Sequence, residues 1–174
     1  MATYKIDPMH SEVSFKIKHL MISTVTGNFT TYDATIEANN EDLSDAKFTF
    51  EADINSINTN NEQRDGHLKS ADFFDAEVHP KMRFVSTSFT KKDDSNFVMV
   101  GNLTLKGITN PVSLNVEYAG KMVDPYGNEK HGFEFAGKIS RKEFGLEWSA
   151  VTEAGGIVVS DEVKLLINAQ FTKA

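Results

Sequence analysis

The chain has 174 residues, of which 40% are hydrophobic and 25% charged, and its formal net charge at pH 7 is -7. This length and apolar content are sufficient for one well-buried core, so we expect a single domain over residues 1–174. The acidic balance argues against a nucleic-acid partner, because phosphate backbones are bound by clustered lysine and arginine. The sequence contains no cysteine, which excludes disulfides and thiolate metal sites.

The first clear element is a strand over residues 11–19. Its side chains alternate strictly between a polar row and an apolar row that ends in a histidine; the apolar row is Val13, Phe15, Ile17 and His19. Successive side chains of a strand point to opposite faces, so this pattern predicts a half-buried antiparallel strand. Asp7-Pro8 before the strand is a turn signal, and we interpret residues 20–26 after it as a turn or crossing segment.

Two further runs repeat this alternation. The second begins at Gly27-Asn28, and its apolar row is Tyr32, Ala34, Ile36 and Ala38. Phe29 is out of phase with that row, so we expect a bulge near Thr30 or Thr31. The apolar row of the third run is Phe48, Phe50, Ala52 and Ile54. Strands that follow each other in sequence are usually neighbours in space, which favours a sheet made of successive pairs.

The alternation stops at about residues 58–75, where we predict a short helical insert. Asn60 or Thr59 can cap such a helix, whereas Gly66 weakens it. Three apolar side chains would anchor the insert to the rest of the protein: Leu68, Phe73 and Phe74. We interpret the insert as a lid or plug over one end of a β structure.

Strand signals resume at residue 81 and continue to the end of the chain. The first of these runs, residues 81–90, has Met82 and Phe84 on one face and Val85 and Phe89 on the other. The later runs cover residues 97–106, 112–118, 133–139 and 160–172, with polar turns at 92–96, 107–111 and 124–128. Residues 4–6 form an extra edge piece, through which two chains could pair as a homodimer.

Counted from residue 11, the chain therefore has eight long amphipathic runs with mostly short turns. This pattern predicts an all-β fold, an eight-stranded antiparallel β-barrel with a short helical insert, because closure removes the exposed edges of such a sheet. Gly101 and Gly137 lie inside strand runs, where a strongly curved sheet favours a missing side chain. A two-sheet sandwich is the alternative, although its strands are usually shorter.

Four stretches, in order and over nearly the whole chain, together resemble the signatures of the YceI-like family of polyisoprenoid-binding proteins. They are YKIDPMHSEVSFKIKHL with STVTGNF, DGHLKSADFFDAEVHPKMRFVS, GNLTLKGITNPVSLNV and KISRKEFGLEWSAVTEAGGIVVSDEVKLLINAQF. The resemblance implies a lipocalin-like barrel with an amphiphilic isoprenoid or long-chain lipid in its apolar bore, and no cofactor beyond such a bound lipid. It also implies a bacterial protein, and many family members are exported to the periplasm.

The start of the chain bears on location. Its first ten residues, MATYKIDPMH, contain no apolar run and no small-residue cleavage site, and no apolar run in the sequence is long enough to span a bilayer. We therefore expect a cytoplasmic protein with no integral membrane segment, or a periplasmic one if a leader peptide originally preceded this sequence.

Two interpretations of the barrel interior compete: it is filled by its own side chains, or it holds a hydrophobic small molecule. Each buried methylene contributes about 0.8 kcal/mol, so a tail of about twenty carbons could gain on the order of 10 kcal/mol before ordering costs. Tail length would then dominate affinity, and a quinone, a prenyl phosphate or a fatty amide could compete. The residues predicted to bind the ligand are Phe15, Ile17, His19, Tyr32, Phe48, Phe50, Phe84, Met99, Leu103, Phe135, Arg141 and Trp148.

No catalytic or metal site is expected. The five histidines are scattered: His10 and His19 lie near opposite ends of the first strand, His67 in the insert, His79 in a turn and His131 in a loop. No HxH or HxxxH spacing and no nucleophile motif occurs.

Arg141 matches an R-x-[DE]-F-G…W pattern of the family that ends at Trp148. It could bind a headgroup phosphate or carbonyl, or pair with Glu143 or Asp161 to fix a turn. Non-enzymatic lipid binding is the leading hypothesis. The alternatives are an enzyme that acts on such an amphiphile through His19 or Arg141, and a stress-related scaffold without a ligand.

Overall fold

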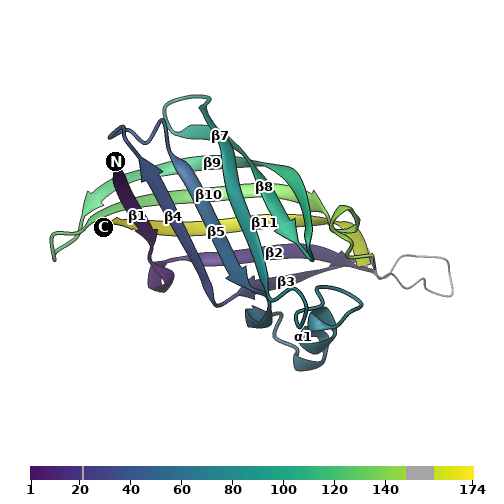
Figure 1. The fold of residues 1–174 in the computed structure, drawn as a ribbon. Coiled ribbons are helices and arrows are strands. Elements are labelled where there is room, and N and C mark those ends of the chain that lie inside the picture. Colours follow the sequence, from purple (N-terminus) through teal and green to yellow (C-terminus); the bar gives the residue numbers. More distant parts are fainter. Residues whose placement is uncertain (21, 148–158) are drawn as a thin grey trace.

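The protein is built almost wholly from β-strands, and the part of the chain that the structure describes has one α-helix (Figure 1). The computed structural model describes residues 1–20, 22–147 and 159–174. The elements in chain order are β1 (Ala2–Ile6), η1 (Pro8–His10), β2 (Glu12–His19), β3 (Ser23–Phe29), β4 (Tyr32–Ala38), β5 (Lys47–Asp53), η2 (Ile54–Ser56), β6 (Ile57–Asn58), α1 (Glu62–Lys69), β7 (Lys81–Lys91), β8 (Asn96–Leu105), β9 (Ile108–Val123), β10 (Glu129–Ser140), η3 (Arg141–Phe144) and β11 (Val159–Lys173).

Eight of these strands form a closed antiparallel barrel, which confirms the predicted fold. Their order around the barrel is β1-β4-β5-β7-β8-β9-β10-β11, and β11 pairs with β1 to close it. The long strand β11 has a second partner, because its earlier part pairs with β2 while its last residues pair with β1. β2 and β3 therefore extend the wall beyond the barrel proper, as Figure 1 shows along the lower side.

The short strand β1 corrects one expectation. Residues 4–6 were predicted to be an edge piece, but β1 is bonded on both sides, with Tyr4 opposite Ile36 of β4 and Lys173 of β11. The main-chain amide of Asp7 then continues the pairing by donating to the Gln170 carbonyl at 2.8 Å. This strand thus offers no free edge for a second chain.

The boundaries of β3 and β4 also differ from prediction. Residues 20–26 were interpreted as a turn, yet β3 begins at Ser23, and its serine, threonines and glycine hid the alternation. The expected bulge at Thr30 or Thr31 is instead a bend that separates two strands. Phe29 ends β3 and Tyr32 begins β4, which explains why the two side chains are out of phase.

The turn between β8 and β9 is shorter than predicted. It consists of Lys106 and Gly107, both with positive φ (51° and 75°), the backbone of a tight type I′ hairpin. Pro111, expected in the turn, lies within β9 opposite Asn102. A proline is tolerated there because β10 pairs with β9 only from Leu114 onward, so this part of β9 has an unpaired side.

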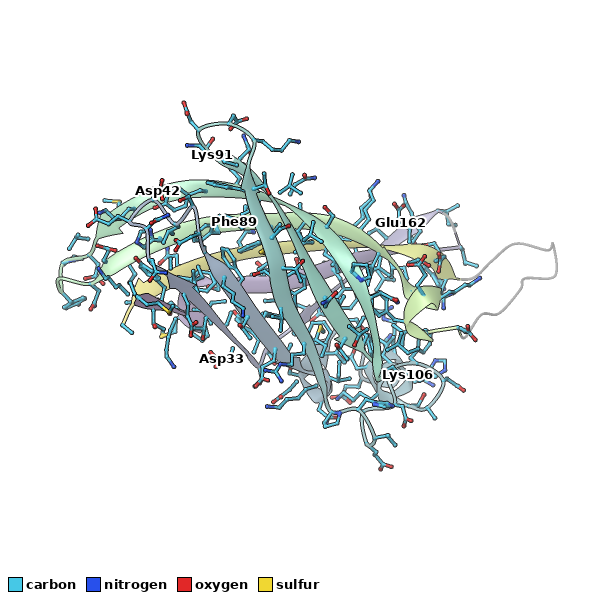
Figure 2. The ribbon with its side chains drawn as sticks, turned by 45° about the horizontal axis from the view of Figure 1, so that its top comes forward. Asp33, Asp42, Phe89, Lys91, Lys106 and Glu162 are labelled. Carbon is cyan, nitrogen blue, oxygen red and sulfur yellow. The ribbon has the colours of Figure 1, made fainter. Side chains whose placement is uncertain are left out.

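A bulge in β7 reverses the predicted orientation of Phe89. The register of β7 against β8 shifts between Ser86 and Ser88, and an extra residue in a strand moves the following side chains to the other face. Phe89, labelled in Figure 2, therefore packs inside the barrel, with its ring 5.0 Å from that of Phe48. The sequence placed it on the face opposite Phe84.

Both strand glycines lie where neighbouring atoms leave no room for a side chain. A Cβ atom at Gly101 would lie 2.6 Å from the Val85 carbonyl oxygen and would also meet the Phe84 ring, and one at Gly137 would lie 2.5 Å from Leu114 Cδ2. These contacts leave no room for a larger residue.

The helical insert is confirmed, with a different cap. α1 covers residues 62–69, and its N-cap is Asn61, whose side chain accepts a hydrogen bond from the Arg64 amide at 2.9 Å. Neither Asn60 nor Thr59 caps it: Asn60 has a φ of 62°, and Thr59 is buried and hydrogen-bonded to Asp65. The segment after the helix turns back on it, since the Phe74 amide donates to the Leu68 carbonyl.

The barrel has two distinct ends. At one, which we call the helix end, Lys106 of the β8–β9 turn donates through its Nζ to the carbonyls of Ala71 and Gly145, so this turn, the segment after α1 and η3 lie together. At the other, the terminal end, the two chain termini lie side by side, with the Ala174 amide donating to the Thr3 carbonyl (Figure 1). Lys106 and Lys91 in Figure 2 lie toward opposite ends of the barrel.

Candidate functional site

The barrel encloses an apolar inner cavity of about 140 Å³. Ser14 and Thr49 are the two polar side chains among the described residues that line it, and the Ser14 hydroxyl is already bonded to the Leu166 carbonyl at 2.9 Å. Seven residues from the predicted ligand-binding set lie in its wall, from five different strands: Phe15, Phe48, Phe50, Phe84, Met99, Leu103 and Phe135. The alternation of the strands brings them together, because each lies on the inward face.

A larger outer cavity of about 490 Å³ adjoins the inner one. Its wall comes from β2, from α1 with the segments on either side, and from residues near η3; the predicted residues Ile17, His19 and Arg141 line it. The helical insert thus covers one side of this cavity. Five basic side chains line it, and no carboxylate does among the described residues; the basic ones are Lys18, His19, Arg64, His67 and Arg141.

Two aromatic residues, Phe15 and Phe74, line both cavities and so mark the junction between them. Phe15 lies directly over Gly27, where a Cβ atom would be 2.7 Å from its Cε1 atom. Phe29 links the pair, with ring centroids 5.7 Å from Phe15 and 6.4 Å from Phe74. The sequence identified Phe15 as a site residue but assigned Phe74 only an anchoring role, because the fold of the insert was needed to aim its ring inward.

Arg141 is held by the main chain. Its side chain is 2% exposed, and its guanidinium donates to the carbonyls of Leu146 at 2.6 Å, Ser160 at 2.8 Å and Val159 at 3.1 Å. Burial lowers the pKa of the guanidinium, and the negative charge of Asp161 opposes that shift.

The predicted pairing of Arg141 with Glu143 or Asp161 is not found as a direct bond in the described residues. Asp161 instead accepts from the Ser140 hydroxyl at 2.6 Å and from the Lys142 amide at 3.1 Å. These bonds hold the pKa of Asp161 below its usual range against the opposing effect of burial. Arg141 and Asp161 therefore both tie η3 to β11, each through its own hydrogen bonds.

The other polar groups of the outer cavity differ in how they are engaged. Arg64 donates to the Thr59 hydroxyl at 2.8 Å and to the Thr59 carbonyl at 2.6 Å, and His67 pairs with Asp72 at 3.0 Å. Lys18 and His19, by contrast, make no side-chain hydrogen bond or ion pair within residues 1–20, 22–147 and 159–174. Among the basic side chains of the outer cavity, these two are the ones most available to a ligand.

Two predicted site residues are not part of this arrangement. Tyr32 lines neither cavity: its hydroxyl donates to the Ser11 carbonyl at 3.0 Å, and its ring lies 6.4 Å from that of Phe50. Trp148 lies outside the described residues. The binding role assigned to the remaining residues stays a prediction.

The sequence missed a polar cluster at the terminal end. His131 was expected in a loop, but it is in β10 and 1% exposed. Its Nδ1 is hydrogen-bonded to the Tyr118 hydroxyl at 2.7 Å and its Nε2 to Glu129 at 2.9 Å, and the bond to His131 lowers the pKa of Glu129. These residues line neither cavity, so the cluster is separate from the candidate site.

No group of three or more metal-ligating His, Cys, Asp or Glu side chains occurs in the described ranges. No helix in the same ranges is long and apolar enough to cross a membrane.

Comparison with known proteins places this geometry in context. The model of the YceI-like domain family matches residues 4–171. A UPF0312 protein of Staphylococcus aureus (strain USA300) is 38% identical over 173 residues, which cover 99% of this chain and 98% of the relative. The solved YCEI protein of Campylobacter jejuni is 35% identical, with a TM-score of 0.76 over 89% of this chain and 88% of that one.

A polyisoprenoid binding domain from Saccharophagus degradans has a TM-score of 0.72 at 15% identity and covers 98% of both chains. At that identity the similarity is one of fold.

Proposed function

The chain belongs to the YceI-like domain family, and from this premise we propose that it binds a long-chain amphiphilic lipid, of the polyisoprenoid or isoprenoid-quinone type, and carries or sequesters it unchanged. The observation that carries the proposal is the pair of adjoining cavities, one apolar and buried and the other rimmed by basic side chains. Such a pair matches a molecule with an apolar tail and a polar head. The fold shared with the Saccharophagus domain, which is named for polyisoprenoid binding, supports the same ligand class.

The orientation of the ligand follows from the two linings. The far end of the tail occupies the inner cavity, because burying a polar head there would leave its hydrogen bonds unmade, and the wall offers few partners. The head lies in the outer cavity beside Lys18 and His19, whose side chains are not engaged by other described residues. Both can donate hydrogen bonds, so a head with acceptor oxygens, a phosphate or a quinone carbonyl, fits best.

A non-enzymatic role is favoured over catalysis by the state of Arg141. A guanidinium that donates to three main-chain carbonyls is committed to holding η3 and β11 together. The enzyme alternative then depends on His19. If the wild type converts a bound amphiphile and His19→Ala does not, an enzyme is favoured. If the ligand stays unchanged on prolonged incubation with the wild type, a carrier is favoured.

The direct experiment is native mass spectrometry of the freshly purified protein, followed by extraction and identification of any released lipid. A bound lipid of defined mass is the expected result. Delipidated protein should take up geranylgeranyl phosphate or a short-tailed ubiquinone at one molecule per chain. Failure of both the purified and the reloaded protein to hold any such molecule would refute the proposal.

Variants separate cavity binding from adhesion to the surface. Ala169→Leu and Ala34→Leu add bulk to the wall of the inner cavity and should abolish or strongly weaken uptake. Ala136→Leu makes the same change on β10, at a residue that lines neither cavity, and should bind like the wild type. Equal binding by all three variants would instead favour a scaffold whose barrel plays no part in recognition.

A further inference from the structure

Aromatic rings fill the barrel on the side of the inner cavity toward the terminal end. We call this set of side chains the aromatic plug; it consists of Phe48, Phe89, Phe97, Tyr118, Phe133, Phe135 and Phe171. Phe133 is at its centre, with ring centroids 5.7 Å from Phe48 and 5.8 Å from both Phe135 and Phe171. It is 4% exposed, so the centre of the plug is buried.

The plug has two layers. Phe48, Phe135 and Phe171 form the first and line the inner cavity. The remaining rings line neither cavity and pack behind the first layer. In this second layer Phe89 stacks on Phe97 at 4.4 Å with a 9° angle between the rings, and Tyr118 lies 5.0 Å from Phe133. The inner cavity therefore ends at the first layer.

Hydrogen bonds fix the plug from behind. The Tyr118 hydroxyl is bonded to His131, which is bonded in turn to Glu129, and the Tyr4 ring packs edge-on against the His131 ring at 4.9 Å. Tyr118 also lies at the register shift between β9 and β10, where Phe133 is its partner. A ligand tail that pushed into the second layer would have to break this buried network.

The volume in front of the plug limits the size of the tail. A protein cavity of about 150 Å³ holds one benzene molecule, or about 25 Å³ for each heavy atom. By that measure the inner cavity of about 140 Å³ accepts roughly six carbons, about one isoprene unit, and the outer cavity of about 490 Å³ roughly twenty further atoms including the head.

We propose that the aromatic plug acts as a length gauge, so that this protein selects amphiphiles with about 15 to 20 tail carbons, three or four isoprene units, and does not enclose a tail of about 40. The inference rests on the proposed function and adds the tail length to it. A longer tail leaves part of its apolar surface in water, so the carbons beyond the limit bring no further gain in affinity.

A series of prenyl monophosphates tests the gauge directly. The dissociation constants of geranyl, farnesyl, geranylgeranyl and octaprenyl phosphate are measured on the delipidated full chain by native mass spectrometry, below their micelle concentrations. Each isoprene unit up to geranylgeranyl should tighten binding about tenfold or more, and octaprenyl phosphate should bind no better than geranylgeranyl phosphate. Affinity that still rises to octaprenyl phosphate overturns the gauge alone, whereas no binding by any member overturns the proposed function as well.

Variants of the first layer identify the residues that set the limit. Phe48→Ala should improve octaprenyl phosphate binding at least fivefold relative to geranylgeranyl phosphate, and Phe48→Leu should do so to a smaller extent with less risk to folding. Phe144→Leu is the matched control, because Phe144 is a phenylalanine with 1% exposure that lines neither cavity. An unchanged length preference in both Phe48 variants, or an equal change in the control, would overturn the assignment to the plug.

Discussion

Replacement of Arg141 by methionine should cost about 3–5 kcal/mol of unfolding free energy. Methionine has a similar length but no donors, so the carbonyls of Leu146, Val159 and Ser160 lose their partners. A hydrogen bond from a charged donor contributes about 1.5–3 kcal/mol, and a buried carbonyl left unpaired costs about 1–3 kcal/mol. Methionine also avoids the free-energy cost of removing a charged guanidinium from water, which offsets part of the loss and leaves the stated range.

Urea unfolding monitored by circular dichroism measures this difference, with Arg83→Met as the control because Arg83 is exposed on β7. The control should change stability by less than about 0.5 kcal/mol. Arg141→Lys should lie between Arg141→Met and the wild type, since one ammonium cannot reach all three carbonyls. A loss below about 1 kcal/mol in Arg141→Met together with weakened prenyl phosphate binding would refute the structural role and restore the headgroup role.

Three further predictions concern other parts of the barrel. The hydrogen bond from the His10 ring is the main cause of the lowered pKa of Asp7, so Asp7→Asn should lower the melting temperature at pH 7. A lowered carboxyl pKa gives stability that is complete above the unfolded value of about 3.9 and is lost as the pH falls through the folded pKa, so the difference in calorimetry should shrink progressively as the pH is lowered below about 4; a difference that stays constant on acidification would contradict this. Gly101→Ala should destabilise by about 1–3 kcal/mol in urea, because its Cβ would press on the Val85 carbonyl, whereas Gly66→Ala, which meets nothing within 4 Å, should be neutral or stabilising. Phe74→Ala should widen the junction between the two cavities and speed ligand entry in stopped-flow measurements, with little change in preferred tail length; an unchanged entry rate would show that this ring does not limit access.

Part of the candidate site could be predicted from the sequence, because strand alternation assigns each side chain to one face of the sheet. The inward positions of Phe48, Phe84, Met99 and Phe135 follow from a period of two along their strands, and each lines the inner cavity. Phe89 shows the limit of that rule, since a bulge between Ser86 and Ser88 has no clear sequence signal and reverses every later position in β7.

The outer cavity was harder to predict from the sequence, because much of its wall comes from segments whose apolar residues follow no regular periodicity. Phe74 and Arg64 belong to the helical insert, where orientation depends on the Asn61 cap and on how the chain returns to the barrel. Tyr32 illustrates the opposite error: its place in an apolar row is correct, but a hydrogen bond to the Ser11 carbonyl holds its hydroxyl away from both cavities.

The amino-acid sequence by itself determined the strand-rich barrel class, the helical insert and the family, because these depend on local periodicity, turn residues and ordered motifs. Only the tertiary structure decided that β1 closes the barrel, that Arg141 binds main-chain carbonyls and that His131 is buried behind the aromatic plug. Each of these depends on contacts between residues far apart in sequence, made when β11 meets both β1 and β2. The size of the inner cavity is set in the same way, since it is the space left after aromatic rings from six strands have packed around it.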